Sequence, residues 1–229
     1  VVNEPYYSDD HVTIYHGDAL ELLPALPMVD LVVTDPPYII GAVSAGNMAS
    51  KSGGWADMMN SSGWFTSWYR LVDRLLKHDG AMWSFLNWRT LPVVMRAAVD
   101  AQMPLTSMLV WDKQWIGPGG VQGLRPSYEL VALLAKPGFA IEDRGTPDVW
   151  QHKVGSYKES GHPAEKPEGL VRRLITTSGD AGMVLDPFLG SGTTAVAAKN
   201  AGWRAIGIEF EERYCEMAAM RCAQEVLAL

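Results

Sequence analysis

The sequence predicts a layered α/β fold with a mainly parallel sheet and helices on both faces. Short apolar segments alternate with longer segments whose apolar residues recur at helical spacing, which is typical of parallel strands joined by helices. Residues 31–34 form an uninterrupted apolar, β-branched run of the kind found in strands that are buried on both faces. The chain of 229 residues has no clear internal boundary, which indicates one domain, residues 1–229.

The first predicted elements lead from a short strand to a long loop. We expect a strand at residues 12–15 and a helical turn or short helix at 19–26. Two prolines follow the strand 31–34 and end it, because proline has no N–H to donate to a sheet. Residues 41–63 contain five glycines and five serines without periodicity. They predict a flexible loop near the end of that strand, and loops of this length are usually functional or disordered.

The remaining elements follow from hydrophobic spacing. The helices, with apolar residues at helical spacing, are predicted at residues 64–77, 91–101, 168–177, 193–201 and 211–227. The strands, as short apolar runs, are predicted at residues 81–86, 105–111, 128–134, 183–185 and 205–208. Asp79-Gly80 is expected to end the first of these helices, and Pro167 favours the start of another. Residues 137–163 are irregular and contain three prolines.

Composition indicates where the protein works. The N-terminus has neither a basic segment nor an apolar one, and no stretch approaches 18 apolar residues, so secretion and membrane spanning are not expected. The two cysteines, Cys215 and Cys222, lie seven residues apart on one predicted helix and provide no disulfide framework. We therefore expect a reduced, cytoplasmic location.

The net charge of −7 is unevenly distributed. Residues 1–50 contain seven acidic and no basic residues, whereas the rest of the chain has 19 of each. Within that part, residues 51–178 carry 15 basic and 12 acidic residues. A polyanionic partner is therefore not excluded, and the middle of the chain is where we expect it to lie.

A glycine-rich turn connects a predicted strand to a predicted helix. Gly190, Gly192 and Ala195 form a Gly-x-Gly-x-x-Ala pattern, and Glu209 follows at the end of the next strand. Alone, the pattern fits the dinucleotide-binding fingerprint, in which glycines let the backbone approach a nucleotide and the acidic residue binds ribose hydroxyls. An NAD-type enzyme is therefore a first hypothesis.

The position of this turn disfavours a dinucleotide. Only 37 residues follow Gly192, too few for the two mononucleotide-binding halves that a dinucleotide needs. Asp186 precedes the turn, where its carboxylate would repel a pyrophosphate but attract an ammonium group. A nucleoside with an amino-acid tail, such as S-adenosylmethionine, fits these residues better.

A second motif, Asp35-Pro36-Pro37-Tyr38, follows the strand 31–34. An exocyclic amine of adenine or cytosine is a poor nucleophile because its lone pair is delocalised into the ring. Asp35 and the Pro36 carbonyl can each accept one amino hydrogen, and Pro37 fixes the backbone so that both acceptors converge. The ring of Tyr38 offers a flat face to the base. Ligands of open α/β sheets bind at this end of the strands.

Together these segments resemble the permuted amino-methyltransferases that modify DNA, and most of all the β-class, in which the catalytic motif precedes the cofactor motif. The resemblance rests on Asp35-Pro36-Pro37-Tyr38, His162-Pro163-x-x-Lys166-Pro167, the segment from Asp186 to Thr194, and Gly207-x-Glu209. It implies a seven-stranded methyltransferase sheet with one reversed strand and S-adenosylmethionine as the methyl donor. It also implies methylation of a base that is flipped out of double-stranded DNA.

The resemblance also assigns residues to roles. It implies a catalytic pocket made of Asp35, Pro36, Pro37 and Tyr38. The cofactor-binding residues that it implies are Asp18, Asp35, Lys166, Asp186, Pro187, Phe188, Gly190, Ser191, Gly192, Thr193, Thr194 and Glu209. Trp111 and Tyr128 resemble residues beside the target base in the family, or are simply core aromatics. No metal site is expected.

The sequence departs from the family in two respects. Family members usually carry a sizeable target-recognition insert, whereas residues 137–163 offer only a reduced region, so recognition is expected to be short or relaxed, or shared with residues 41–63 and 117–126. The chain is also acidic overall, and phosphate contacts dominate DNA affinity, so we expect weak, salt-sensitive binding. The basic residues considered for DNA contact are Lys51, Arg89, Lys113, Arg125, Arg144, Lys153 and Lys158.

The favoured target is the N6 amine of adenine. The resemblance implies this choice, because the Asp form of the tetrapeptide is typical of the family's adenine enzymes, whereas cytosine enzymes more often begin it with Ser. The pocket chemistry does not separate the two, so N4-cytosine stays an alternative. More distant alternatives are an RNA or protein amine methyltransferase, a non-catalytic DNA-binding module and the NAD oxidoreductase. A homodimer is considered, and a restriction endonuclease partner is not inferable.

Overall fold

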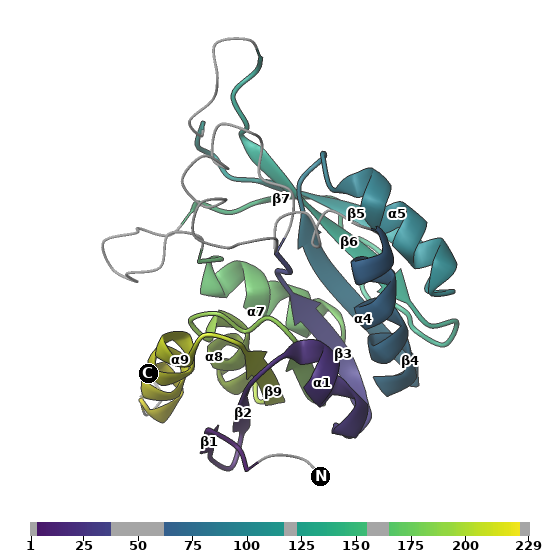
Figure 1. Cartoon of the computed structure of the whole chain (residues 1–229). Helices are drawn as coiled ribbons and strands as arrows, with labels where there is room; N and C mark the ends of the chain where they lie inside the picture. The colour runs from purple at the N-terminus through teal and green to yellow at the C-terminus, as the bar shows by residue number, and fades with distance from the viewer. Residues whose placement is uncertain (1–3, 38–61, 117–122, 155–164, 225–229) are drawn as a thin grey trace.

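The computed structural model describes residues 4–37, 62–116, 123–154 and 165–224, and within them one sheet runs through the molecule (Figure 1). Its nine strands follow the order β1-β2-β9-β8-β3-β4-β6-β5-β7. The strands are β1 (Tyr7–Ser8), β2 (Val12–His16), β3 (Val29–Thr34), β4 (Leu76–Leu86), β5 (Leu105–Asp112), β6 (Tyr128–Ala135), β7 (Val149–Gln151), β8 (Met183–Asp186) and β9 (Arg204–Glu209).

Strand direction confirms the predicted methyltransferase sheet. β2, β9, β8, β3 and β4 are parallel, and β6 runs antiparallel to both of its neighbours, β4 and β5. These seven strands match the expected sheet with one reversed strand. Two short edge strands extend it, because β1 pairs antiparallel with β2 and β7 pairs parallel with β5.

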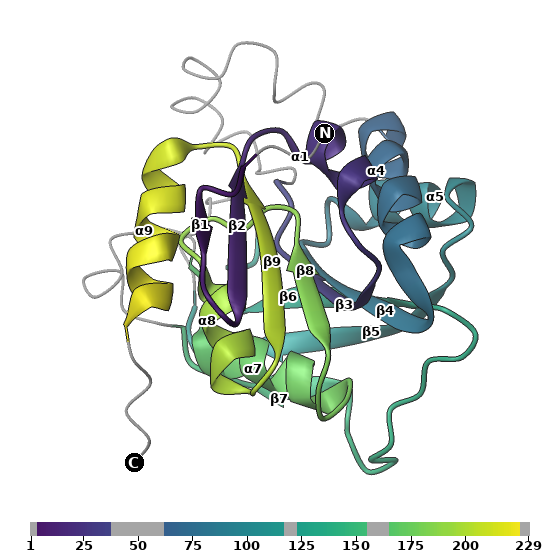
Figure 2. The same cartoon turned by 90° about the horizontal axis from the view of Figure 1, so that it is seen from below.

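Helices cover both faces of the sheet. Figures 1 and 2 show α7, α8 and α9 on one side and α1, α4 and α5 on the other. The helices are α1 (Ala19–Leu22), continued by the 3-10 turn η1 (Leu23–Ala25), α4 (Ser62–Leu75), α5 (Leu91–Asp100), α7 (Glu168–Thr177), α8 (Thr193–Asn200) and α9 (Glu212–Ala223). In the described part of the chain, no helix has the length and apolar character needed to cross a membrane.

The sheet separates two hydrophobic cores, as the alternation of side chains along a strand requires. In β3, Leu31 and Val33 face the core that α7, α8 and α9 complete, and Val32 faces the core of α1, α4 and α5. All three side chains are almost fully buried, which explains the uninterrupted apolar run.

Local differences from the predicted elements have identifiable causes. α4 ends at Leu75 and β4 begins at Leu76, so Asp79-Gly80 lies within a strand and does not end the helix. A Cβ at Gly80 would lie 2.9 Å from the Asp30 carbonyl oxygen, so close approach to β3 requires glycine here. The predicted terminal helix stops at Ala223. The predicted loop 41–63 is wrong at Ser62 and Gly63, which form the start of α4, and the rest of it lies outside the described residues.

The parallel strands bring their carboxyl ends to one edge of the sheet, here called the pocket edge. Thr34 of β3 is level with Ser84 of β4, and Asp186 of β8 is level with Gly207 of β9. β6 is reversed, so it begins at this edge, where Tyr128 pairs with Asp112 at the end of β5. The residues that follow β2, β3, β8 and β9 therefore gather at the pocket edge.

Candidate active site

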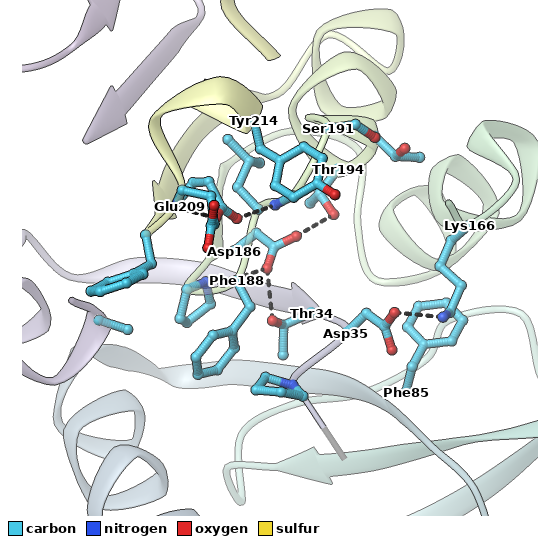
Figure 3. A pocket seen from close by; sticks show the side chains of 18 of the residues that line it. Thr34, Asp35, Phe85, Lys166, Asp186, Phe188, Ser191, Thr194, Glu209 and Tyr214 are labelled. Atoms are coloured by element: carbon cyan, nitrogen blue, oxygen red, sulfur yellow. Dashed lines mark hydrogen bonds and ion pairs between the residues drawn. The ribbon is translucent and has the colours of Figure 1, made fainter. Parts of the chain in front are cut away.

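A cavity of about 580 Å³ opens at the pocket edge (Figure 3). The predicted site residues that line it are Asp18, Asp35, Pro37, Lys166, Asp186, Pro187, Phe188, Gly190, Ser191, Thr193, Thr194 and Glu209. They come from the turns after β2 and β3, from the end of β8, the turn that follows it and the start of α8, from the end of β9 and from the segment before α7. Asp35 and Lys166, which are 131 residues apart in sequence, thus meet in one place.

Three predicted site residues are not among the lining residues. Pro36 is buried, and Tyr38 lies outside the described residues. Gly192 faces away from the cavity, because a Cβ there would lie 2.7 Å from the Cβ of Ala218 in α9. Its φ of 90° also favours glycine, so packing and backbone conformation both account for this residue.

Asp186 is fixed at the floor of the cavity by three hydrogen bonds. Its carboxylate accepts from the Thr34 hydroxyl at 2.7 Å, the Thr194 hydroxyl at 2.6 Å and the Phe188 backbone N–H at 3.0 Å. Burial raises the pKa of Asp186 to about 6, although these hydrogen bonds act in the opposite direction. A buried carboxylate in this state would be stabilised by a cationic ligand.

Glu209 links the glycine turn to the end of β9. Its carboxylate accepts hydrogen bonds from the backbone N–H groups of Gly190 at 2.8 Å and Glu211 at 2.7 Å. Burial is the main cause that raises the pKa of Glu209. Asp18 lies nearby and caps α1, because its side chain accepts a hydrogen bond from the Leu20 N–H at 2.7 Å.

An ion pair that the sequence analysis missed holds the same turn from α9. Arg221 lies 2.6 Å from Glu165 and donates a hydrogen bond to the Ser191 carbonyl at 2.8 Å. Glu165, which lines the cavity, also accepts from the Thr193 hydroxyl at 3.0 Å. Glu165 stands next to Lys166, which could have drawn attention to it, but no local pattern marks Arg221.

Asp35 forms an ion pair at the end of β3 with Lys166, across 2.5 Å between Oδ2 and Nζ. Its second oxygen, Oδ1, is buried and has no hydrogen-bond partner within the part of the chain that the structure describes. Burial raises the pKa of Asp35 in spite of the nearby Lys166 ammonium group. Lys166 is thus placed against the catalytic motif, in addition to the cofactor side that the resemblance implied for it.

Aromatic side chains that the sequence analysis did not single out form much of the apolar wall. Trp64, Phe85, Phe210 and Tyr214 line the cavity together with Phe188. The Trp64 and Phe188 rings lie 5.5 Å apart between centroids, which fixes both rings against each other. Trp64 belongs to α4, so its hydrophobic spacing had indicated only a core helix.

Trp111 and Tyr128, for which two interpretations were open, do not line the cavity. Trp111 is 2% exposed and packs edge-on against Phe85, as a core aromatic does. Tyr128 is 42% exposed at the start of β6, at the pocket edge.

The basic residues considered for DNA contact separate in the structure. Arg89, Arg125 and Lys153 lie in segments at the pocket edge, beyond β4, before β6 and beyond β7. Lys113 is also there, but it is 16% exposed and forms an ion pair with Glu129, so it is not a free phosphate ligand. Arg144 lies in the connection that leaves β6 at the opposite edge. Lys51 and Lys158 lie outside the described residues.

Comparison with known proteins decides the family. A model of the N6/N4 type, described as DNA methylase, matches residues 29–220. The chain belongs to this DNA methylase family. M.ScaI, a type II methyltransferase of Streptomyces caespitosus, is 29% identical over 100% of this chain and 86% of the relative. The DNA adenine methyltransferase YhdJ of Escherichia coli (strain K12) is 27% identical over 94% of this chain and 84% of the relative.

Solved structures share the fold of this DNA methylase. M1.HpyAVI in complex with S-adenosylmethionine aligns with a TM-score of 0.71 at 23% identity, over 93% of this chain and 100% of the other. PvuII DNA methyltransferase, which is cytosine-N4-specific, aligns with a TM-score of 0.77 at 20% identity, over 98% of this chain and 90% of the other. The expected family, fold, DNA methyltransferase activity and methyl donor S-adenosylmethionine are confirmed.

The residues around the cavity of this DNA methylase suit that donor. The volume lies in the range of small-molecule sites. Among the described lining residues, Lys166 is the one basic side chain, and it is ion-paired with Asp35, whereas carboxylates come from several sides. This charge balance favours a cationic nucleoside over a pyrophosphate. A Cβ at Gly190 would meet nothing within 4 Å, so the turn leaves its backbone open to a ligand.

Proposed function

We propose that this DNA methylase transfers the methyl group to the N6 amine of adenine in double-stranded DNA, with Asp35, Pro36, Pro37 and Tyr38 as the catalytic pocket. The single observation that carries the chemistry on an exocyclic amine is the buried Asp35 Oδ1, which adjoins the cavity and has no hydrogen-bond partner among the described residues. The choice of adenine over cytosine rests on the Asp form of the motif. An unpaired buried carboxylate oxygen is costly unless a ligand satisfies it. An exocyclic amine is a donor of the kind that this oxygen needs.

Asp35 and its neighbours account for the chemistry on the amine side. Asp35 Oδ1 accepts one amino hydrogen and the Pro36 carbonyl accepts the other, which draws the nitrogen lone pair out of conjugation with the ring. S-adenosylmethionine, when bound, supplies an electrophilic methyl group on a positively charged sulfur. The nitrogen becomes positive as its new C–N bond forms and the bond from the methyl carbon to sulfur breaks. The nearby carboxylate stabilises this developing charge until one amino proton is released to water.

The cofactor side of the pocket follows from the same contacts. Asp186 offers a buried negative charge, and Glu209 keeps lone pairs for ribose hydroxyls while it holds Gly190. We assign cofactor binding to the predicted residues that line the cavity, with Gly192 supporting the turn from behind. Glu165, Phe188 and Tyr214 join them as lining residues that shape the site.

Double-stranded DNA would approach the pocket edge, with the target base flipped into the cavity. Arg89, Arg125 and Lys153 lie at that edge together with the ion-paired Lys113, and exposed Trp88 and Trp115 lie among them. Basic side chains interspersed with aromatic ones suit nucleic acid. So few phosphate ligands fit the expectation of weak, salt-sensitive binding with short or relaxed recognition.

Further parts of the proposal concern organisation. All described strands belong to one sheet, which supports a single methyltransferase domain over residues 1–229. Within it we assign residues 41–61 to a loop near the catalytic pocket, because Ser62 and Gly63 belong to α4. Of the reduced target-recognition region predicted at 137–163, we assign target contact to the part that follows β7, because Arg144 lies at the opposite edge. A homodimer on DNA, a cytoplasmic location and a role in restriction–modification are further expectations, tested by sizing with and without DNA and by genomic context.

The target base is tested by product analysis. The purified protein is incubated with mixed-sequence DNA and S-adenosylmethionine, and the DNA is digested to nucleosides for mass spectrometry. N6-methyladenine is the expected product. N4-methylcytosine, the second candidate, would overturn the base assignment, and it is kept because a cytosine-N4-specific enzyme shares the fold. RNA and protein substrates in parallel reactions should remain unmethylated.

A further inference from the structure

A chain of four alternating charges runs from the catalytic motif into the sheet. Asp35 Oδ2 lies 2.5 Å from Lys166 Nζ, which lies 3.4 Å from Glu129 Oε2, and Glu129 Oε1 lies 2.5 Å from Lys113 Nζ. The side chains of Lys166, Glu129 and Lys113 are 9%, 17% and 16% exposed. Four such groups, mostly withdrawn from water, are costly to bury unless their charges balance, as they do here.

Each charge in this chain comes from a different element. Asp35 follows β3, Lys166 precedes α7, Glu129 belongs to β6, and Lys113 follows β5. Glu129 stands opposite Trp111 in the β5–β6 pair, so the sheet itself fixes its backbone. Lys166 also lies over the Phe85 ring at 5.2 Å, which leaves its ammonium group little freedom.

Resting on the proposed role of Asp35, we infer that Glu129, supported by Lys113, is a positioning residue for methyl transfer: it holds Lys166 against Asp35 Oδ2 and leaves Asp35 Oδ1 for the target amine. Glu129 shares the charge of Lys166, so Lys166 orients the Asp35 carboxylate without neutralising it fully. Lys113 in turn limits how strongly Glu129 draws Lys166 away. Neither Glu129 nor Lys113 lines the cavity, so both act through Lys166.

The charged groups that face Asp35 change its pKa in opposite directions. Lys166 and Lys113 lower the pKa of Asp35, whereas Glu129 raises it, and burial raises it most. Asp186, on the neighbouring strand end, is a further carboxylate that interacts with Asp35. Methyl transfer requires ionised Asp35, so the rate should fall as the pH drops through the pKa of Asp35.

The test compares Glu129→Gln with Lys113→Met, which remove the two partners of one ion pair. Single-turnover transfer is measured against pH with saturating DNA and cofactor. Glu129→Gln should shift the acidic limb of the profile to lower pH and slow transfer about tenfold, because Lys166 then binds Asp35 alone. Lys113→Met and Lys166→Met should shift the limb to higher pH, each shift being about one unit. Glu129→Asp, which keeps the charge, should restore most of the wild-type profile.

A matched control is Asp73→Asn, which removes a similar ion pair far from the cavity. Lys136 and Asp73 are also 2.5 Å apart and 23% and 28% exposed, so this variant tests the loss of an ion pair alone. It should leave the limb in place. If Glu129→Gln and Lys113→Met move the limb in the same direction, or neither moves it, the pair is only structural and the inference is wrong.

A second measurement does not depend on activity. The carboxyl carbon of Asp35 is titrated by ¹³C NMR in the protein without DNA, and its signal is assigned by its loss in Asp35→Asn. The titration of Asp35 should move to lower pH in Glu129→Gln and to higher pH in Lys113→Met. If Glu129→Gln failed to fold, Lys113→Met alone would decide, and an unchanged titration in that variant would overturn the inference. If the wild-type chain methylated no DNA amine, the proposed function would fail while this titration still reported on the chain of charges.

Discussion

The Glu209 carboxylate accepts a hydrogen bond from the backbone N–H of Gly190 across 2.8 Å. The acidic residue at the end of β9 therefore fixes the glycine turn, in addition to the ribose contact expected of it. The second carboxylate oxygen is held by the N–H of Glu211. Both halves of the proposed nucleoside site are thus positioned before any ligand binds, which lowers the entropy cost of binding.

The two glycines of the turn should respond differently to alanine. Gly192→Ala should destabilise the fold by about 2–4 kcal/mol, because its Cβ would collide with Ala218 and its φ is 90°. Gly190→Ala meets open space and has a φ of 57°, so a loss of only about 1 kcal/mol is expected, with a clear loss of cofactor affinity. Chemical denaturation and calorimetric titration separate the two effects. Equal stability losses would contradict the assignment of Gly192 to packing.

Replacing the carboxylate of Asp35, the proposed catalytic group, should separate effects on methyl transfer from effects on cofactor binding. Asp35→Ala should abolish transfer, and the isosteric Asp35→Asn should reduce the single-turnover rate by roughly 10²–10⁴-fold, because the developing positive charge loses its counter-charge. Cofactor affinity should change less than about threefold for Asp35→Asn, because the other assigned cofactor residues, among them Asp186 and Glu209, stay in place. Transfer of labelled methyl groups and isothermal calorimetry provide the two readouts. Full activity in Asp35→Ala would show that the pocket is assigned wrongly.

Asp186 should lower the stability of the ligand-free protein and strengthen its binding of the cofactor. Its pKa of about 6 lies above the value of 3.8 for an ordinary aspartate, so the folded state favours the protonated form. The ionised group therefore costs on the order of 3 kcal/mol at neutral pH, and stability should increase as the pH falls from above 6 toward 4. Asp186→Asn should raise the stability of the ligand-free protein at pH 8, with a smaller gain at pH 5, and should weaken cofactor binding.

Thermal unfolding at both pH values, with and without S-adenosylmethionine, measures the change in stability and the stabilisation that the cofactor provides. Asp180→Asn is the control, because Asp180 is an exposed aspartate on the connection before the same strand. It should alter neither stability nor binding. A variant at Asp186 that lost stability equally at pH 8 and pH 5 would contradict a raised pKa as the source of the effect.

Salt dependence should identify the DNA-facing edge. Arg89→Ala should reduce the slope of log affinity against log salt by about one, as expected for the loss of one phosphate contact. The guanidinium of Arg89 lies 4.6 Å from the centroid of the Trp88 ring, so Arg89→Lys should restore only part of the slope. Arg144→Ala, at the opposite end of β6, should leave the slope unchanged. Fluorescence anisotropy at several salt concentrations measures each slope, and similar losses for both alanine variants would rule out this orientation.

Local sequence patterns were sufficient for most of the fold and for the contiguous part of the site. The helix at Glu168–Thr177 was predicted with its observed bounds, because Pro167 and the apolar spacing are both local signals. β7 was missed within residues 137–163, since three residues beside prolines carry no periodicity. The placement of Asp79-Gly80 was wrong because glycine there serves contact with another strand, and that need is invisible to a local rule.

The part of the site that sequence did not reveal consists of long-range contacts. Arg221 reaches the glycine turn from 30 residues away, and its role depends on how α9 packs on α8. Lys113 was expected to contact DNA, but it forms an ion pair with Glu129, which lies 16 residues away on the adjacent strand. The spacing of residues within a motif predicts what the motif binds, whereas ion pairs between distant segments can be recognised only when the fold is known.

The reversal of β6 places both ends of residues 113–127 at the pocket edge, since Asp112 and Tyr128 are paired and the Lys113 N–H donates to the Ser127 carbonyl at 3.0 Å. A connection anchored in this way can be lengthened or exchanged without shifting the register of any strand. Because residues 117–126 are expected to share in target recognition, replacing this connection should change what the protein reads on its substrate. The residues of the cavity need not change, so the fold and the choice of target can evolve separately.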